Sequence, residues 1–100
     1  MKNIYKIHWT DHALKELDEV YNYLKANWTE KELRKLSLEI EKTIELISKN
    51  PELFPIIDPD ETIRRAVITK HNTIYYKKLN EAVEILSFFS NKKNPDKLDL

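Results

Sequence analysis

The stretch that decides the fold covers residues 10–51 and reads TDHALKELDEVYNYLKANWTEKELRKLSLEIEKTIELISKNP. In its first half, apolar side chains recur every three or four residues, which is the spacing of a helix with one buried face. They are Ala13, Leu14, Leu17, Val20, Tyr21, Leu24 and Trp28. Thr10 or Asp11 can cap this helix, because a short polar side chain accepts a hydrogen bond from the first turn.

A second helix follows after a short connection. Residues 29–32 read TEKE, a capping box in which the Thr29 hydroxyl and the Glu32 carboxylate each accept a backbone N–H. Asn50-Pro51 ends the helix, because the residue before proline avoids the α conformation. One face carries Leu33, Leu36, Ile40, Ile44 and Ile47. Two amphipathic helices joined so closely predict an antiparallel hairpin.

Sequence on both sides of this hairpin reads as strands. Residues 2–9 predict one strand, and residues 63–69, 73–79 and 82–89 predict three more, separated by short turns. Three of the four prolines fall within residues 51–60, which we expect to form a loop, and residues 90–100 are a polar tail. The order β-α-α-β-β-β predicts a single α+β domain over residues 1–100. The helix hairpin would pack on one face of a small, mostly antiparallel sheet.

The composition excludes several kinds of chemistry. The 100 residues contain no Gly and no Cys, so glycine-rich phosphate loops, thiolate nucleophiles and cysteine metal sites are absent. We expect no cofactor, no metal and no membrane association, and a cytoplasmic location. Without Gly, the turns need another residue for left-handed backbone, and Asn72 and Asn80 are placed to serve.

Charge is divided unequally along the chain. Residues 1–60 carry 9 basic and 12 acidic side chains, a net of −3, whereas residues 61–100 carry 8 basic and 5 acidic, a net of +3. A basic sheet with interleaved aromatic residues is typical of a surface for RNA or for an acidic partner. The alternative is a solvated face with lysines protecting the edges. The basic and aromatic residues are Arg64, Arg65, Lys70, Tyr75, Tyr76, Lys77, Lys78, Phe88, Phe89, Lys92 and Lys93.

Few residues are candidates for catalysis. Arg64 and Arg65 are neighbours on a predicted strand, so one can reach a carboxylate or phosphate while the other faces the helices or a loop. The alternative for this pair is an ion pair with Asp58 or Glu61. His71, in a predicted turn, is a weak candidate for a general acid or base. His8 lies at the end of a predicted strand and His12 at the start of a predicted helix, which is poor geometry for binding one metal ion.

Six segments, in this order and spacing, resemble the RelE/ParE toxin superfamily of bacterial type II toxin–antitoxin systems. They are residues 12–24 (HALKELDEVYNYL), 47–55 (ISKNPELFP), 63–67 (IRRAV), 72–77 (NTIYYK), 83–86 (VEIL) and 91–98 (NKKNPDKL). The resemblance implies a growth-inhibiting toxin that is partnered by an antitoxin, whose extended or helical segment wraps the toxin sheet and helices.

The resemblance also bears on the target. Members similar to RelE cut mRNA on the ribosome with an Arg late in the hairpin, an Arg after the last strand, and a Tyr or His in the tail. Here the corresponding positions hold Thr73 and Asn91, and the tail has neither Tyr nor His. Lys92 could supply the missing positive charge and His71 the missing general base, but both are weak candidates. The tail and the Tyr75-Tyr76 hairpin are more similar to ParE-type members, which bind DNA gyrase and are not nucleases.

The sequence therefore predicts a ParE-like toxin that inhibits gyrase when free of its antitoxin. The alternatives are a ribosome-dependent mRNA endonuclease and an inactive homologue that acts only as a binding module. The residues expected to contact the antitoxin or the target are Arg64, Arg65, Lys70, Tyr75, Tyr76, Lys77, Lys92 and Lys93.

Overall fold

The computed structural model of this chain describes residues 4–90. Its elements follow the predicted order with one extra short strand. They are β1 (Lys6–Trp9), α1 (Asp11–Asn27), α2 (Glu30–Lys49), β2 (Ile56–Asp58), β3 (Ile63–Thr69), β4 (Asn72–Lys78) and β5 (Ala82–Ser90). The fold is the expected α+β arrangement. Neither described helix has an apolar stretch of the length needed to cross a membrane.

The helices begin where the capping residues predict. Thr10 is the N-cap of α1, and its hydroxyl oxygen accepts the Ala13 N–H at 3.1 Å. Both hydrogen bonds of the predicted capping box at Thr29 and Glu32 are present. One member of the expected buried stripe is placed differently, because Leu14 is 48% exposed.

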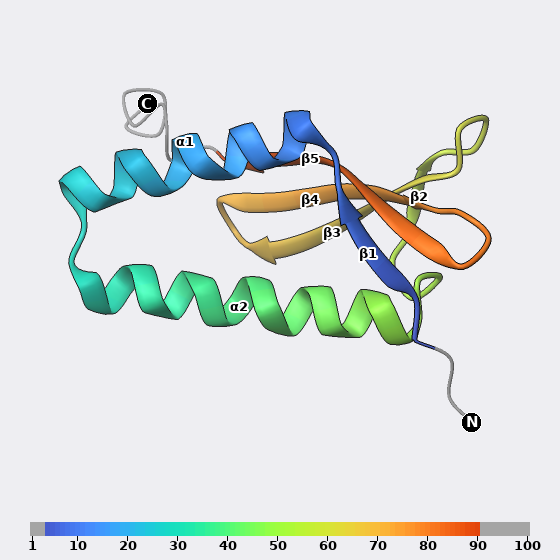
Figure 1. Cartoon of the computed structure of the whole chain (residues 1–100), viewed down its shortest axis with the longest axis horizontal. Helices are drawn as coiled ribbons and strands as arrows, with labels where there is room; N and C mark the ends of the chain where they lie inside the picture. Colours follow the sequence, from blue (N-terminus) through green and yellow to red (C-terminus); the bar gives the residue numbers. More distant parts are fainter. Residues whose placement is uncertain (1–3, 91–100) are drawn as a thin grey trace.

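The five strands form one sheet in the order β1-β5-β4-β3-β2. All neighbours are antiparallel except β1 and β5, which run parallel. The helices run in opposite directions along the sheet (Figure 1), with α1 beside β5 and α2 contacting β3 and β1. Apolar side chains of both helices and of β3, β4 and β5 meet in a single core.

The prediction of a loop over residues 51–60 is wrong in part, because β2 lies within it. β2 forms the outer edge of the sheet and pairs with β3 through Ile56 opposite Arg64 and Asp58 opposite Ile63. It has three residues, includes a register shift and lies between two prolines. So short a strand forms only because β3 offers an edge to pair with, and no local pattern marks it.

The expected role of asparagine in the turns is also wrong. Within residues 4–90, Thr62 is the one non-glycine residue with positive φ, at 55°. Asn72 is instead the first residue of β4, buried at 2% exposure, and its amide nitrogen donates to the Thr69 hydroxyl at 2.8 Å. Asn72 therefore stabilises the β3–β4 turn by a side-chain hydrogen bond between the end of β3 and the start of β4, and not by a left-handed backbone conformation.

A bulge in β5 changes which side chains face the core. Tyr76 pairs with Ile85 and Tyr75 pairs with Ser87, so Leu86 has no partner on β4. The extra residue shifts the alternation that follows. As a result Phe88 is 1% exposed, whereas Phe89 is 50% exposed on the other face.

Candidate functional site

The side of the sheet opposite the helices forms a mixed basic and apolar surface, which we call the open face. Its members alternate along the strands with core residues such as Ala66, Ile74 and Ile85, and therefore point away from the helices. The open face includes Lys6, His8, Ile63, Arg65, Val67, Thr73, Tyr75, Lys77, Glu84 and Phe89.

Three predicted site residues come together on the open face. Arg65 lies directly opposite Tyr75 across β3 and β4, and Lys77 is two residues from Tyr75 on the same face. Arg65 is exposed, and no carboxylate pairs with it among residues 4–90. A guanidinium, a phenol and an ammonium on neighbouring positions can bind a carboxylate or a phosphate.

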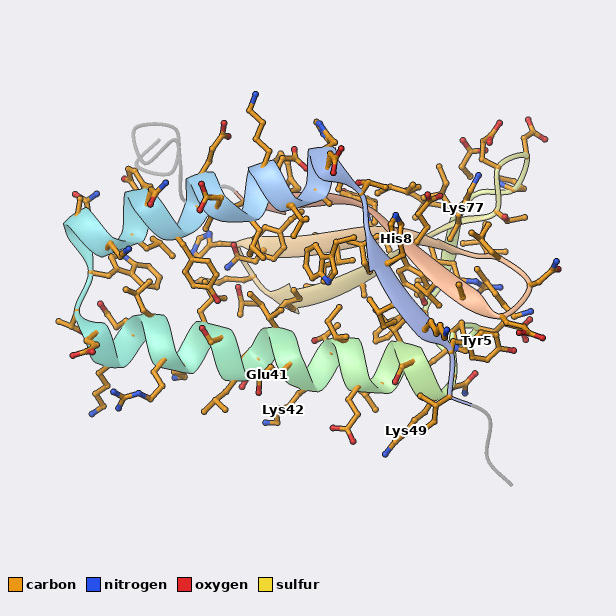
Figure 2. All side chains as sticks on the ribbon, viewed as in Figure 1. Tyr5, His8, Glu41, Lys42, Lys49 and Lys77 are labelled. Carbon is orange, nitrogen blue, oxygen red and sulfur yellow. The ribbon has the colours of Figure 1, made fainter. Side chains whose placement is uncertain are left out.

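The open face also has a second row of titratable groups. His8 on β1, Glu84 on β5 and Lys77 on β4 occupy successive positions across the three strands. Figure 2 shows His8 and Lys77 at the same end of the sheet. On β1, β3, β4 and β5, Glu84 is the one carboxylate of the open face, against Lys6, Arg65 and Lys77. The open face therefore favours anionic partners.

Next to these charges lies an apolar area that the sequence analysis did not identify. Thr73 pairs with Val67 on one side and Phe89 on the other, and these two side chains are 57% and 50% exposed. Alternation along a strand predicts that every second side chain faces away from the helices. The bulge in β5 shifts this alternation, so that Phe89 is one of the side chains that face away. No sequence signal marks that bulge.

Arg64 has the second role foreseen for the arginine pair, because it faces a loop. Its Nη1 donates to the Phe54 carbonyl oxygen at 2.7 Å and to the Glu52 carbonyl oxygen at 3.3 Å. The predicted alternative partners, Asp58 and Glu61, form no ion pair with it within the described chain. Arg64 thus holds the segment after α2 against the sheet through its Nη1.

Tyr76 belongs to the core, so we leave it out of the open face. Its side chain is fully buried, and its hydroxyl donates to the Pro51 carbonyl oxygen at 2.6 Å. Its ring meets Phe54 edge to face, with centroids 6.4 Å apart. Burial raises the pKa of Tyr76 to about 12, although the nearby charge of Arg64 acts in the opposite direction.

Lys70 and His71 lie apart from Arg65, Tyr75 and Lys77. They form the β3–β4 turn and line a groove of about 330 Å³ between that turn and α2. Of the two weak catalytic candidates, His71 lines this groove and not the open face, whereas Lys92 lies outside the described residues, as do Asn91 and Lys93. Thr73, which replaces the hairpin Arg of RelE-like nucleases, lies on the open face.

Several solved structures share this fold. The chain resembles a structure of the chromosomal ParDE TA system from P. aeruginosa, with 14% identity and a TM-score of 0.68 over 87% of this chain and 96% of that one. A conserved hypothetical protein from Helicobacter pylori, HP0894, matches with 15% identity and a TM-score of 0.58, over 89% of this chain and 97% of that one. A copper-bound mutant toxin from Helicobacter pylori matches with 14% identity and a TM-score of 0.53, over 91% and 99%. At these identities the similarity establishes the fold.

The family assignment comes from the sequence itself. Among curated proteins none matches this chain. The family described as the ParE toxin of the type II toxin–antitoxin system parDE matches residues 7–95, which includes every described strand and helix except the first residue of β1. A toxin of this kind implies an antitoxin partner. The chain belongs to the ParE toxin family of type II toxin–antitoxin systems.

Proposed function

We propose that this toxin inhibits DNA gyrase in the cytoplasm when it is free, and that its antitoxin neutralises it by covering the open face. The observation that carries the proposal is the match of the ParE toxin family to residues 7–95. The resemblance of the chain to ParE-type rather than RelE-type members supports gyrase as the target. On this proposal the protein acts by binding and is not an enzyme.

The arrangement of side chains supports binding better than RNA cleavage. A metal-free ribonuclease needs a group that takes the 2′-hydroxyl proton and a cation beside the scissile phosphate. Arg65 and Lys77 on the open face could supply charge, but Thr73 stands where an Arg is expected. His71 lines the groove on the other side of the β3–β4 turn. Two other open-face residues, His8 and Glu84, could act as a base, but they lie in the row of Lys77 and not in the row of Arg65 and Tyr75.

The charge of the open face supports an acidic antitoxin segment. Lys6, Arg65 and Lys77 outnumber the single carboxylate of Glu84, and Val67 and Phe89 offer an apolar area beside them. A segment with acidic and apolar side chains would complement both parts of this surface.

A pair of assays tests the target. The protein, purified without its antitoxin, is added to a gyrase supercoiling reaction and to a ribosome programmed with mRNA. We expect loss of supercoiling with no mRNA cleavage. Cleavage that disappears in the Lys92→Ala and His71→Ala variants would instead establish the endonuclease.

A growth assay tests whether the protein is toxic at all. Induction without the antitoxin is expected to arrest growth, and co-expression of the antitoxin to restore it. If growth continues although soluble protein is verified on a gel, the remaining hypothesis is an inactive homologue that acts only as a binding module. A small reading frame adjoining this one is the expected source of the antitoxin.

A further inference from the structure

Two aromatic side chains of the open face lie outside the core. Phe89 is 50% exposed. Tyr75 is half-buried, and its hydroxyl forms no hydrogen bond within residues 4–90. Phe89 is opposite Thr73, and Ser87 is opposite Tyr75, on the same two strands. The two aromatic residues therefore occupy diagonal positions, with Cα atoms about 7–8 Å apart. Rings exposed in this way on a sheet can stack on the unpaired bases of a nucleic acid.

Basic side chains lie next to these rings. Arg65 is directly opposite Tyr75 on β3, and Lys77 is two residues beyond Tyr75 on β4. Neither forms an ion pair with a residue of the described chain, although Glu84 lies across from Lys77. The guanidinium and the ammonium are therefore available to phosphates. From Thr73 to Lys77 the surface extends for about 13 Å along β4, which is room for about two or three nucleotides.

The combination of rings and charges selects the form of the ligand. Positive charge alone would suit an acidic peptide as well as a nucleic acid. A base adds a flat π-face that stacks on an aromatic side chain, and a carboxylate side chain has no such face. In a duplex the bases stack on one another and their faces are covered, so a single strand can use both the rings and the charges, and a duplex only the charges.

We propose that the open face binds single-stranded DNA. Bases stack on Tyr75 and Phe89, and the adjoining phosphates lie against Arg65 and Lys77. The inference rests on the proposed function in one respect, namely that DNA is the nucleic acid which a toxin acting on gyrase encounters. Since the antitoxin is proposed to cover the same face, DNA binds to the free toxin only. The contacts themselves depend on these four side chains and not on the identity of the target.

Fluorescence anisotropy with the purified protein tests the ligand class. The probe is a labelled oligothymidylate of about ten nucleotides. We expect it to bind at least about fivefold more tightly than an abasic DNA strand of the same length, a DNA duplex or an oligoglutamate peptide of equal charge. Equal affinity for the abasic strand or the peptide would show that the face selects charge alone, and would overturn the proposal. Tighter binding of oligouridylate than of oligothymidylate would assign the face to RNA and overturn the choice of DNA.

Variants of the rings locate the stacking. Phe89→Leu and Tyr75→Leu keep an apolar side chain but remove the π-face. Each should weaken binding of the oligothymidylate at least about fivefold and leave the affinity for the abasic strand within about twofold. The abasic strand serves as the control for folding, because a misfolded variant would lose both ligands. Unchanged binding of the oligothymidylate by both variants would contradict stacking at these positions.

Variants of the charges locate the phosphates. Arg65→Gln/Lys77→Gln should weaken binding of both strands, and the slope of log affinity against log salt concentration should become shallower by about 1.4, or about 0.7 for each lost phosphate contact. Lys15→Gln/Lys25→Gln, with the same loss of charge on exposed positions of α1, should leave affinity and slope nearly unchanged. Equal effects of the two double variants would overturn the proposal.

These measurements use the toxin and oligonucleotides alone. A protein that binds the oligothymidylate as expected but does not inhibit supercoiling would contradict the proposed target and not this binding site. A protein that inhibits supercoiling but does not bind the oligothymidylate would contradict the binding site and not the target.

Discussion

The hydroxyl of Tyr76 is buried and donates to the Pro51 carbonyl oxygen at 2.6 Å. Tyr76→Phe removes the donor and leaves that carbonyl unpaired, so we expect the free energy of unfolding to fall by about 1–3 kcal/mol. Urea unfolding measures the change. Tyr75→Phe, at the neighbouring open-face position, is the control and should cost less than about 0.5 kcal/mol. Similar losses in the two variants would contradict the assignment of Tyr76 to the core.

The same residue predicts a dependence on pH. Its pKa is about 12 in the folded protein, against the ordinary 10.0. A group whose pKa is raised by folding stabilises the protein fully below the unfolded pKa and loses that effect as pH rises through the folded pKa. Between pH 10 and pH 12, the free energy of unfolding of the wild type should therefore fall by about 2–3 kcal/mol more than that of Tyr76→Phe. A constant difference between the two proteins over this range would argue against burial of the phenol.

Thr62 provides a test of backbone strain. Its φ of 55° lies in the left-handed region, which is costly for a β-branched residue and free of cost for glycine. We expect Thr62→Gly to raise the free energy of unfolding by about 1 kcal/mol. Thr73→Gly, within β4, should lower it by about the same amount, because glycine weakens a strand. Thermal unfolding of both variants decides the matter, and a loss in Thr62→Gly would refute the strain.

At the scale of elements, Glu16 joins α1 to β5. β1 pairs with β5 only as far as Ile85, and beyond that point the Glu16 Oε1 accepts the Ser87 hydroxyl at 2.7 Å and the Phe88 N–H at 2.9 Å. The His12 Nε2 lies 3.3 Å from the same carboxylate oxygen. Glu16 thus replaces the missing strand partner at this edge, where an unpaired backbone group would otherwise be left.

We expect Glu16→Ala to lower the free energy of unfolding by about 1–3 kcal/mol and to speed hydrogen exchange at the Phe88 amide. Glu16→Gln keeps an oxygen acceptor and should lose less than half as much. Lys15→Ala, one residue away and exposed, is the control. If Glu16→Ala leaves exchange at Phe88 unchanged, the carboxylate does not protect that edge.

At the scale of the whole molecule, zero net charge conceals two surfaces of opposite sign. Residues 1–60, with the helix hairpin, carry −3 and residues 61–100, with most of the sheet, carry +3. Figure 2 shows Lys42 and Lys49 on the side of α2 away from the sheet, where they pair with Glu39 and Glu45. The basic groups of the open face form no ion pair within residues 4–90, although Glu84 lies across from Lys77, so an acidic partner should bind there.

Substitution of Arg65 tests this surface. Arg65→Glu reverses a charge on the open face and should weaken antitoxin binding about tenfold or more. Lys15→Glu, the same reversal on α1, and Lys2→Glu near the N-terminus should have much smaller effects. Titration calorimetry of the three variants gives the comparison. Equal weakening by all of them would show that the open face is not the partner surface.

The sequence by itself determined the helix hairpin, because the spacing of apolar residues and the capping box at Thr29 act within a few residues along the chain. The sequence also determined three of the later strands, because their apolar and β-branched residues form short runs between turns. The unequal division of charge between residues 1–60 and 61–100 is a property of the sequence as well. The sequence also restricted the roles of Arg64 and Arg65, since neighbours on a strand face opposite ways. Which of the two faces outward was not decided locally.

Only the tertiary structure decided the remaining features, because each depends on contacts between distant segments. β2 exists because β3 offers it an edge. Phe89 faces outward because Leu86 is left without a partner on β4. Arg64 and Tyr76 donate hydrogen bonds to the backbone carbonyls of residues 51–54, and Lys70 joins Lys35 in one groove because α2 packs beside the β3–β4 turn. Residues far apart in sequence come together only when the core forms, and that packing fixes which charges remain free to bind a partner.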